Sequence, residues 1–440
     1  MLPDTNSQGV KSMSRTTHTT RRSLRLLTGL LALLLTTGAV AQVSYDLGGE
    51  LRADFGVAVD GYIPVAAADL TLRLSGEVGS GFFPDAVFMA ELSAEYDAAD
   101  TTTPFSVRLG RAYATVYLGP IDLSVGNQVV SWGSADALSP VDVINPRDLS
   151  YPIADPASQK LATPMLRAVA HASGGVTVDM VLVPVFVASE LPGARWQPAV
   201  DLPPGVIVVG VEDPIVARPA VELANVQFGV RATLDLNIGG GADISAMYYR
   251  GFRHLPAVTY LPVPTAEPGQ YVIQPVLSYD PVQVLGVDFS AVVGQFVLRG
   301  EAAYTITGTP PSLPGGVPTP VGTDTVEAVL GVETNLPGGP FISLQGIYQH
   351  AAAGATTPAS DTYSTATIAR YEPNNRTGLD FAWLHSWSDG SGAIRPSLSY
   401  TFADGLIGTA EAAVFYGAAG SEYGAWRDNS QFRASVAFSF

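Results

Sequence analysis

Three features of the 440-residue sequence predict an all-β fold, a single transmembrane antiparallel β-barrel of about 16–18 strands with short periplasmic turns and long extracellular loops. The chain begins with an export segment, its later segments alternate between apolar and polar residues, and short turns alternate with long Pro-rich connections. No later stretch is an uninterrupted apolar run of helical length. If the mature chain crosses a membrane, it must therefore cross as strands, because only helices and closed barrels satisfy their backbone hydrogen bonds in lipid.

The export segment is residues 1–41, which have the pattern of a cleaved signal peptide. Four arginines between residues 15 and 25 form a basic start, residues 26–40 are apolar, and Ala-Val-Ala at 39–41 matches a cleavage site. A membrane anchor is the alternative, but the apolar run is shorter than the roughly 20 residues that a helical span needs. The sequence therefore predicts a mature barrel over residues 42–440, exported through the inner membrane to the outer membrane.

The composition excludes several classes of function. The net charge is −17, which argues against nucleic acid as a partner, since nucleic-acid binders carry clustered Lys and Arg. The chain has no Cys, so it has no disulfides, thiolate metal sites or Cys nucleophiles. No set of His, Asp and Glu has a metal-binding spacing, and no nucleophile motif stands out. The sequence thus predicts no metal, no cofactor and no catalytic residue, and hence no enzyme.

Period-two alternation predicts the strands in order. In the first of them, Leu47 and Leu51 fall on one face, and Glu50 and Arg52 on the other. Charged residues stand in mid-strand, which in a barrel would line a wet lumen. The same pattern predicts strands at 43–57, 66–79, 84–97, 104–117, 120–130, 162–172, 175–186, 223–235, 241–254, 281–292, 294–306, 323–335, 340–350, 361–371, 376–386, 392–402, 407–417 and 429–440. The segments at 361–371 and 407–417 carry the weakest signal.

A half-buried soluble sheet shows the same alternation, so the connections help to decide. Short turns at 118–120, 173–175, 237–241, 293–295 and 336–340 alternate with long stretches at 131–161, 187–222, 255–280 and 308–322. Short turns at one end and long loops at the other are typical of outer-membrane barrels. The charged residues of the polar faces are then the predicted lumen lining: Glu50, Arg52, Arg73, Glu77, Arg231, Arg299 and Glu327. The acidic residues on these faces predict a mild preference for cations.

The last strand ends the chain with an aromatic residue. Phe432, Val436, Phe438 and Phe440 alternate with small or polar residues. This strand resembles the assembly signal of Gram-negative outer-membrane proteins, which the barrel-insertion machinery reads by pairing with the strand edge. The resemblance implies that the strand docks there and then closes against the first strand. An ordinary edge strand of this kind on a soluble protein would invite aggregation.

One stretch has a distinctive motif. Residues 124–167 contain SVGNQVVSWGSADAL, then DVINPRDL, then MLRA. These motifs resemble an outer-membrane barrel family of Gram-negative bacteria known as domain of unknown function 1302, which is porin-like. The match covers roughly 45 residues and implies the fold more than the function. Asn127 departs from the family, where Arg more often precedes the Gln.

The loop at 131–161 has two readings. It is either an outward surface loop with a stiff Asn-Pro turn, or a loop folded into the lumen as a constriction, where charged side chains would set selectivity. Arg167 lies just beyond the loop and could pair with one of its carboxylates. The candidate pore residues are Trp132, Asp136, Asp142, Asn145, Arg147, Asp148 and Arg167.

The function that the sequence favours is passive diffusion of small solutes through a porin-like channel. An outer-membrane transporter of hydrophobic compounds with a plugged lumen is the first alternative, because the long stretches 187–222 and 255–280 are apolar and Pro-rich. The segment 187–222 could fold inward or pair as a small extra hairpin. A structural or adhesive barrel is the second alternative. The expected partners are outer-membrane lipid, the insertion machinery and an unidentified small solute; a homo-oligomer is open.

Overall fold

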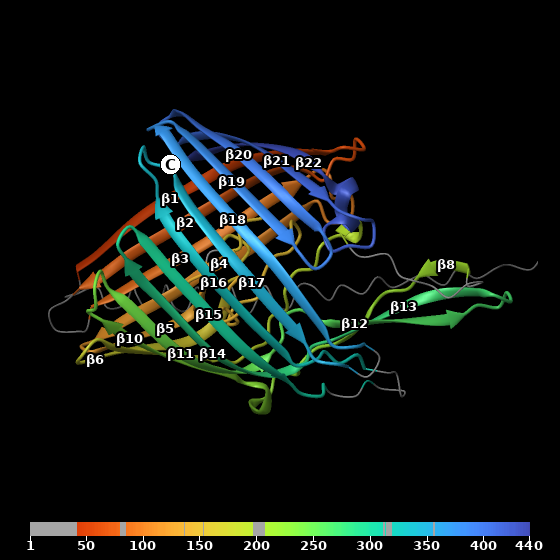
Figure 1. Ribbon diagram of the computed structural model, residues 1–440, viewed down its shortest axis with the longest axis horizontal. Coiled ribbons are helices and arrows are strands. Elements are labelled where there is room, and N and C mark those ends of the chain that lie inside the picture. The colour runs from red at the N-terminus through yellow and green to blue at the C-terminus, as the bar shows by residue number, and fades with distance from the viewer. Residues whose placement is uncertain are drawn as a thin grey trace, which may run out of the picture.

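The structure is a closed barrel in which the strands run diagonally around a central lumen (Figure 1). The computed structural model describes residues 42–79, 85–135, 137–152, 154–196, 207–310, 313, 319–354 and 357–440. The predicted signal peptide, residues 1–41, lies outside the described residues. Within them, no helix is long and apolar enough to span a membrane.

Eighteen antiparallel strands form the barrel wall, and each pairs with its neighbours in the chain. They are β1 (Gln42–Ala58), β2 (Val65–Gly79), β3 (Ala86–Asp97), β4 (Phe105–Leu118), β5 (Ile121–Gln128), β6 (Thr163–Ala172), β7 (Val176–Val183), β10 (Gln227–Leu236), β11 (Ala242–Phe252), β14 (Pro281–Val293), β15 (Phe296–Thr307), β16 (Thr325–Asn335), β17 (Phe341–Ala351), β18 (Ser360–Asn374), β19 (Thr377–Ser386), β20 (Ser391–Ala403), β21 (Leu406–Tyr416) and β22 (Gln431–Ser439). The predicted fold class is confirmed, and each predicted strand overlaps one of these, including the two with the weakest signal.

The barrel closes where the last strand meets the first. β22 pairs antiparallel with β1, with Phe438 opposite Leu51. The terminal residue continues the ladder, because the backbone N–H of Phe440 donates to Gly49 at 3.0 Å and its carbonyl accepts from Gly49 at 2.9 Å. The predicted closure of the last strand against the first is thus confirmed. Its role as a docking signal stays a prediction.

The two faces of the wall differ as the alternation predicts. Large apolar side chains such as Tyr45, Leu47, Leu330 and Phe432 are exposed on the outside of the barrel. Polar and charged residues occupy the inward face between them. The apolar outer surface suits the hydrocarbon of a membrane, since antiparallel strands there alternate apolar-out and polar-in.

The two rims also differ. Turns such as 119–120, 294–295 and 404–405 are short, and Gly119 and Gly294 adopt the positive φ that such tight turns need. The long connections, including 129–162 and 184–226, lie at the opposite rim. This alternation matches the predicted arrangement of short turns and long loops.

A small second sheet projects beyond the long-loop rim (Figure 1). It consists of β12 (Ala257–Pro264), β13 (Gln270–Ser278), β8 (Ile207–Val211) and β9 (Ile215–Ala217). The sequence did not predict β12 and β13. For the stretch 187–222, which contains β8 and β9, the sequence left open an inward fold or a small extra hairpin. Both strands instead pair in parallel with β13. Short 3₁₀ segments complete the described fold: η1 (Ala194–Trp196), η2 (Leu223–Asn225) and η4 (Gly424–Asn429).

Candidate functional site

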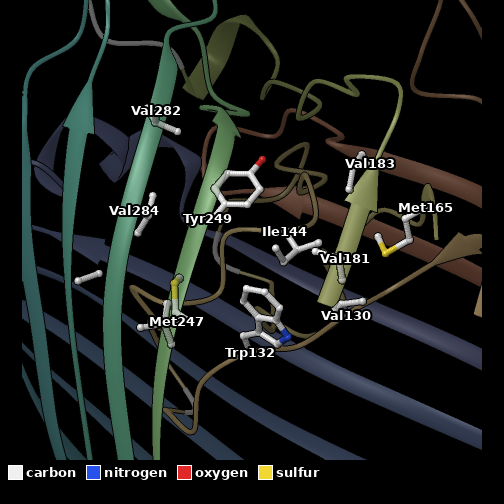
Figure 2. Close-up of a cluster of buried hydrophobic side chains, with 12 residues drawn as sticks. Val130, Trp132, Ile144, Met165, Val181, Val183, Met247, Tyr249, Val282 and Val284 are labelled. Atoms are coloured by element: carbon white, nitrogen blue, oxygen red, sulfur yellow. The ribbon is translucent and has the colours of Figure 1, made fainter. Parts of the chain in front are cut away.

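The loop between β5 and β6, residues 129–162, turns back into the barrel; it is called the inward loop below. Its apolar residues Val130, Trp132, Val141 and Ile144 form one buried cluster with lumen-facing side chains of the wall (Figure 2). The wall residues are Met165, Val181, Val183, Met247, Tyr249, Val282, Val284 and Ala303. The loop therefore has an apolar core of its own inside the barrel, which stabilises it there because apolar surface leaves water.

Trp132 anchors the loop to the wall. Its side chain is 2% exposed, and its Nε1 donates to Oδ2 of Asp179 on β7 at 2.9 Å. Gly229 on β10 makes room for the indole, because a Cβ there would lie 2.7 Å from the ring. Arg167 forms a two-point contact with Asp179, at 2.9 and 2.8 Å. The prediction that Arg167 pairs with a carboxylate of the loop is wrong, since its partner is on the neighbouring strand.

Glu301 on β15 provides a second anchor. Its Oε1 accepts hydrogen bonds from the backbone N–H groups of Ser134 and Ala135, the latter at 2.5 Å. Its Oε2 accepts from the hydroxyl of Ser139 at 2.6 Å. One carboxylate on the wall thus satisfies three donors of the loop, which matters because unpaired buried donors are costly.

Asn145 ties the two ends of the loop together. Its Oδ1 accepts from the backbone N–H of Val130 at 2.8 Å. Its Nδ2 donates to the carbonyls of Gln128 and Leu161, both at 2.9 Å. The Asn-Pro motif is therefore a structural brace at the entrance of the loop, and Asn145 is buried rather than presented to a channel.

Asp142 is neutralised inside the loop. It pairs with Lys160 at 2.7 Å and with Arg147 at 3.0 Å, and its own side chain is almost fully buried. Arg147 also donates to the carbonyl of Pro156 at 3.0 Å and remains partly exposed. Of these groups, Arg147 is the one that faces open space. Asp136 lies outside the described residues.

Asp148 ties the loop to β4, the neighbour of the strand from which the loop leaves. Its carboxylate pairs with Arg108 on β4 at 3.1 Å, and Arg108 also pairs with Glu190 at 2.8 Å. Burial opposes ionisation of Asp148, but hydrogen bonds from Ser150 and Arg108 outweigh it and lower the pKa of Asp148. Burial raises the pKa of Glu190 above its usual value, an effect that Arg108 partly offsets.

Tyr151 makes the furthest contact of the loop. Its hydroxyl donates to Oε1 of Glu411 on β21 at 2.9 Å, and the guanidinium of Arg433 on β22 lies 4.2 Å from its ring centre. Burial and the negative charge of Glu411 raise the pKa of Tyr151, so the phenol keeps its proton and acts as a donor. The loop therefore crosses the lumen from β7 and β15 to β21 and β22.

A second segment, residues 184–196, also enters the barrel mouth. Trp196 packs edge-on against Phe415 and Trp426, with ring centres 5.5 Å away in each case. At the start of this segment, Nδ1 of His254 contacts the carbonyl oxygen of Val187 at 2.8 Å. The inward alternative for 187–222 therefore agrees with the contacts of its residues 187–196.

A cleft of about 630 Å³ remains between the inward loop and the wall formed by β18 to β21. The lining residues include Leu138, Arg147 and Leu149 from the loop, and Ile368, Leu384 and Arg395 from the wall. A smaller space of about 240 Å³ adjoins it and shares Arg395 and Glu411. Both spaces lie between the inward loop and the strands at the carboxy-terminal end of the barrel.

The charged residues predicted as lumen lining lie on the inward face, and most have a partner there. Arg52 pairs with Asp54, Arg73 with Glu91, Arg231 with Asp288 and Arg299 with Glu333, at 2.7 to 3.0 Å. Glu327 accepts from Gln349 at 2.7 Å. Glu50 and Glu77 occupy the same face, opposite Thr71 and Ser44 in the strand register.

The family model described as "Protein of unknown function (DUF1302)" matches residues 60–440. The chain belongs to this family. The match extends far beyond the motif at 124–167 and includes nearly the whole barrel. DUF1302 membership agrees with the resemblance seen in the sequence. No curated protein sequence matches the chain.

Solved structures with a similar fold include outer-membrane barrels. OpdK, an outer membrane protein of Pseudomonas aeruginosa, has a TM-score of 0.54 at 9% identity, with 90% of this chain and 99% of OpdK covered. OmpF of Salmonella typhi, in a complex with daunomycin, has a TM-score of 0.44 at 10% identity, covering 90% and 97%. A triple mutant of Rhodopseudomonas blastica porin has a TM-score of 0.41 at 13% identity, covering 90% and 100%. The similarity to OpdK supports the fold, a barrel like that of this outer membrane protein.

The sequence did not single out the wall residues that hold the loop: Asp179, Glu301, Glu411 and Arg433. Each stands on a polar strand face, like many residues without such a role. The available signal was a charge at an inward position, and that signal does not say which charge a distant loop will contact.

Proposed function

We propose that this protein is an outer-membrane channel through which small solutes diffuse passively, and that the inward loop narrows its lumen. The observation that carries the proposal is the path of that loop, which is anchored at Glu301 and Asp179 on one wall and reaches Glu411 on the other. A barrel of this size has an aqueous lumen unless loops fill it. Here a loop fills part of it and leaves the cleft beside β18 to β21.

Selection by this channel would act at the cleft. Arg147 is the predicted constriction residue that faces the remaining space, whereas Trp132, Asn145 and Asp142 serve to hold the loop. The walls keep acidic positions such as Glu50 and Glu77, which form no ion pair with another described residue, and these support the mild cation preference. Charged side chains at a narrow point are what sets selectivity in other pores.

Planar-bilayer conductance tests this proposal, with and without residues 134–160. We expect the wild-type channel to conduct salt and the deletion to conduct several-fold more, because the lumen behind the loop becomes continuous. A reversal potential in a salt gradient measures the ion preference. A wild-type protein that conducts nothing would contradict the proposal, and an unchanged conductance after the deletion would remove the loop from the conducting path.

A transporter of hydrophobic compounds is the second candidate, favoured by one observation. Leucine, isoleucine, alanine and proline side chains line much of the cleft, although the inward face of a water-filled barrel is usually polar. This candidate predicts that the purified protein carries bound lipid and shows no ion conductance. Mass spectrometry of an organic extract, run beside the bilayer measurement, separates the two candidates.

Export and assembly belong to the same proposal. A signal peptide over residues 1–41 would bring the chain to the periplasm, and the aromatic last strand would engage the insertion machinery. On the outside of the barrel, Phe432, Val436 and Phe438 are exposed toward lipid, and Phe438 stacks on Phe440 at 6.2 Å. Amino-terminal sequencing of the membrane-inserted protein would identify the cleavage point. A first residue other than Gln42 would revise it.

A further inference from the structure

The outer surface of the barrel has a hollow where β16, β17 and β18 run side by side (Figure 1). Its volume is about 380 Å³, at the lower end of the range for small-molecule sites. Leu330 and Gly346 lie opposite each other in the strand register, and Leu330 is 65% exposed on the outside of the wall. Apart from its neighbours in the chain, a Cβ at Gly346 would have only the carbonyl oxygen of Leu330 within 4 Å, at 3.9 Å. The missing side chain of Gly346 therefore leaves a gap in the lipid-facing surface.

Aromatic side chains close the hollow on the side of the long-loop rim. Tyr348 and Tyr363 lie opposite each other on the outer face, with ring centres 5.2 Å apart. Beside them, the backbone N–H of Trp387 donates to the carbonyl of Tyr363 at 2.8 Å, and its indole Nε1 donates to Oγ1 of Thr365 at 3.3 Å. Tyr and Trp on the outside of membrane proteins lie at the level of the lipid head groups. The gap at Gly346 is thus just below that level, where acyl chains begin.

A carboxylate stands next to the aromatic side chains, one step nearer the rim. Asp361 lies opposite His350 in the register and two residues from Tyr363, on the same face. The hydroxyl of Tyr348 donates to Oδ1 of Asp361 at 2.8 Å, and Nδ1 of His350 contacts the same oxygen at 2.9 Å. The side chain of Asp361 is 50% exposed. Because both contacts use Oδ1, Oδ2 can accept hydrogen bonds from a ligand, and a primary ammonium has three donors to offer.

We propose that this hollow binds a membrane lipid whose head group carries a primary ammonium. One acyl chain fills the gap at Gly346, and the ammonium donates to Oδ2 of Asp361. The hollow is continuous with the apolar outer surface that suits hydrocarbon, so a lipid chain is the occupant, and opposite charge selects the head group. The chain is held by van der Waals packing, since an unfilled gap forfeits those contacts. The site is on the outside of the barrel, so the inference goes beyond the proposed function and does not depend on it.

Native mass spectrometry of the full-length protein in detergent tests the site, with phosphatidylethanolamine as the probe. Two lipids with the same acyl chains change only the head group: phosphatidylcholine has no N–H to donate, and phosphatidylglycerol has no ammonium. We expect phosphatidylethanolamine to bind about three- to fivefold more tightly than either, the range for a half-exposed ion pair. Glycerophosphoethanolamine, which lacks the chains, should not stay bound. Equal binding of the three lipids, or no retained lipid, overturns the inference.

Two variants locate the binding. Gly346→Leu fills the gap and should abolish retention of all three lipids, whereas Asp361→Asn should make phosphatidylethanolamine bind like phosphatidylcholine. Ala246→Leu is the matched control, because it enlarges an outward side chain on β11, opposite the exposed Val287, and should retain lipid as the wild type does. Unchanged binding and head-group preference in either hollow variant overturns the assignment. Heat-dependent gel mobility confirms that each variant forms a closed barrel, and Asp361→Asn keeps the test valid if Gly346→Leu does not assemble.

A second copy of the chain is the competing occupant of the hollow, and the same spectra distinguish it. Lipid that stays bound to the wild type and is lost from Gly346→Leu, with the oligomeric state unchanged, supports the lipid site. An oligomer that carries no lipid and dissociates in Gly346→Leu would make the hollow an interface between copies and overturn the inference.

Discussion

The two walls of the lumen carry similar ion pairs but meet different surroundings. On the wall that the inward loop covers, Arg231 and Asp288 are 20% and 5% exposed. On the wall beside the cleft, Arg370 and Asp380 are 55% and 52% exposed. The strand pattern that produces these pairs is the same. The comparison shows that the loop, rather than the strands, decides which inward residues hold the structure and which remain accessible to a solute.

The largest expected effect comes from the covered wall. Trp132→Ala removes the indole from the buried cluster, which should cost about 3–5 kcal/mol of loop docking. We expect a higher and noisier single-channel conductance and new protease cleavage within 129–162. Trp387→Ala is the matched control, because Trp387 is 61% exposed and lies outside the lumen contacts. Equal conductance in the two variants would mean that the loop does not depend on this anchor.

Glu301→Ala tests the second anchor of the inward loop on the covered wall. The change leaves the N–H groups of Ser134 and Ala135 and the hydroxyl of Ser139 without their acceptor, at a cost of about 1–3 kcal/mol. The tip of the loop should then exchange its amide hydrogens faster, measured by hydrogen exchange with mass spectrometry. Glu327→Ala serves as the control, because the carboxylate of Glu327 accepts from Gln349 on the neighbouring strand and contacts no described residue of the loop. Unaltered exchange at residues 134–139 would contradict the anchor.

Acid should loosen the mouth of the barrel. Burial lowers the pKa of His254 below its usual 6.5, so the docked segment keeps this ring neutral. Docking of residues 184–196 is therefore most stable above pH 6.5, where the ring is neutral in both states. Below pH 6.5 only the undocked ring takes up a proton, so the free energy of docking falls by up to about 1.4 kcal/mol per pH unit. Protease accessibility of residues 184–196 between pH 7.5 and 5 measures this. His254→Gln should be less sensitive to acid, and an identical pH profile would rule out this residue as the cause.

The smallest change in stability is expected on the open wall. The pair of Arg370 and Asp380 is half-exposed and 3.7 Å apart, so it contributes about 0–1 kcal/mol. Arg370→Gln should therefore leave thermal unfolding of the barrel unchanged while shifting the reversal potential toward cations. Arg231→Gln should lower the thermal stability of the barrel and leave the reversal potential unchanged, because it leaves Asp288 buried without its partner. If Arg231→Gln alone shifted the reversal potential, the covered wall rather than the open wall would be the one that faces the conducting path.

The sequence predicted the barrel strands well, and the reason is local. A strand between lipid and water must alternate, so each strand carries its own signal, as in β18, whose weaker pattern still marks it. The second sheet was missed because β12 and β13 contain Pro262, Pro264 and Pro275, which read as loop residues. Proline lacks the N–H that a central strand needs, but it is tolerated in a short sheet that is largely edges.

The candidate site was predicted only in part. The stretch 131–161 was singled out, and both readings of its position were open. Its Asp and Asn residues were expected at a channel, yet Asp142 and Asn145 brace the loop internally. Local sequence shows that polar residues are concentrated, but not whether they will pair with one another. Burial decides that, and burial depends on the wall the loop meets.

By itself, the sequence determined the class of fold, the order of the strands, the face on which each charge stands and the closure of the last strand on the first. These follow from a two-residue period and from hydrogen bonds between neighbouring strands. Only the tertiary structure decided the path of the inward loop. Trp132 meets Asp179, Ser139 meets Glu301 and Tyr151 meets Glu411, from strands far along the chain. Those contacts exist because a closed cylinder brings opposite walls within reach of one loop, a distance that no local pattern encodes.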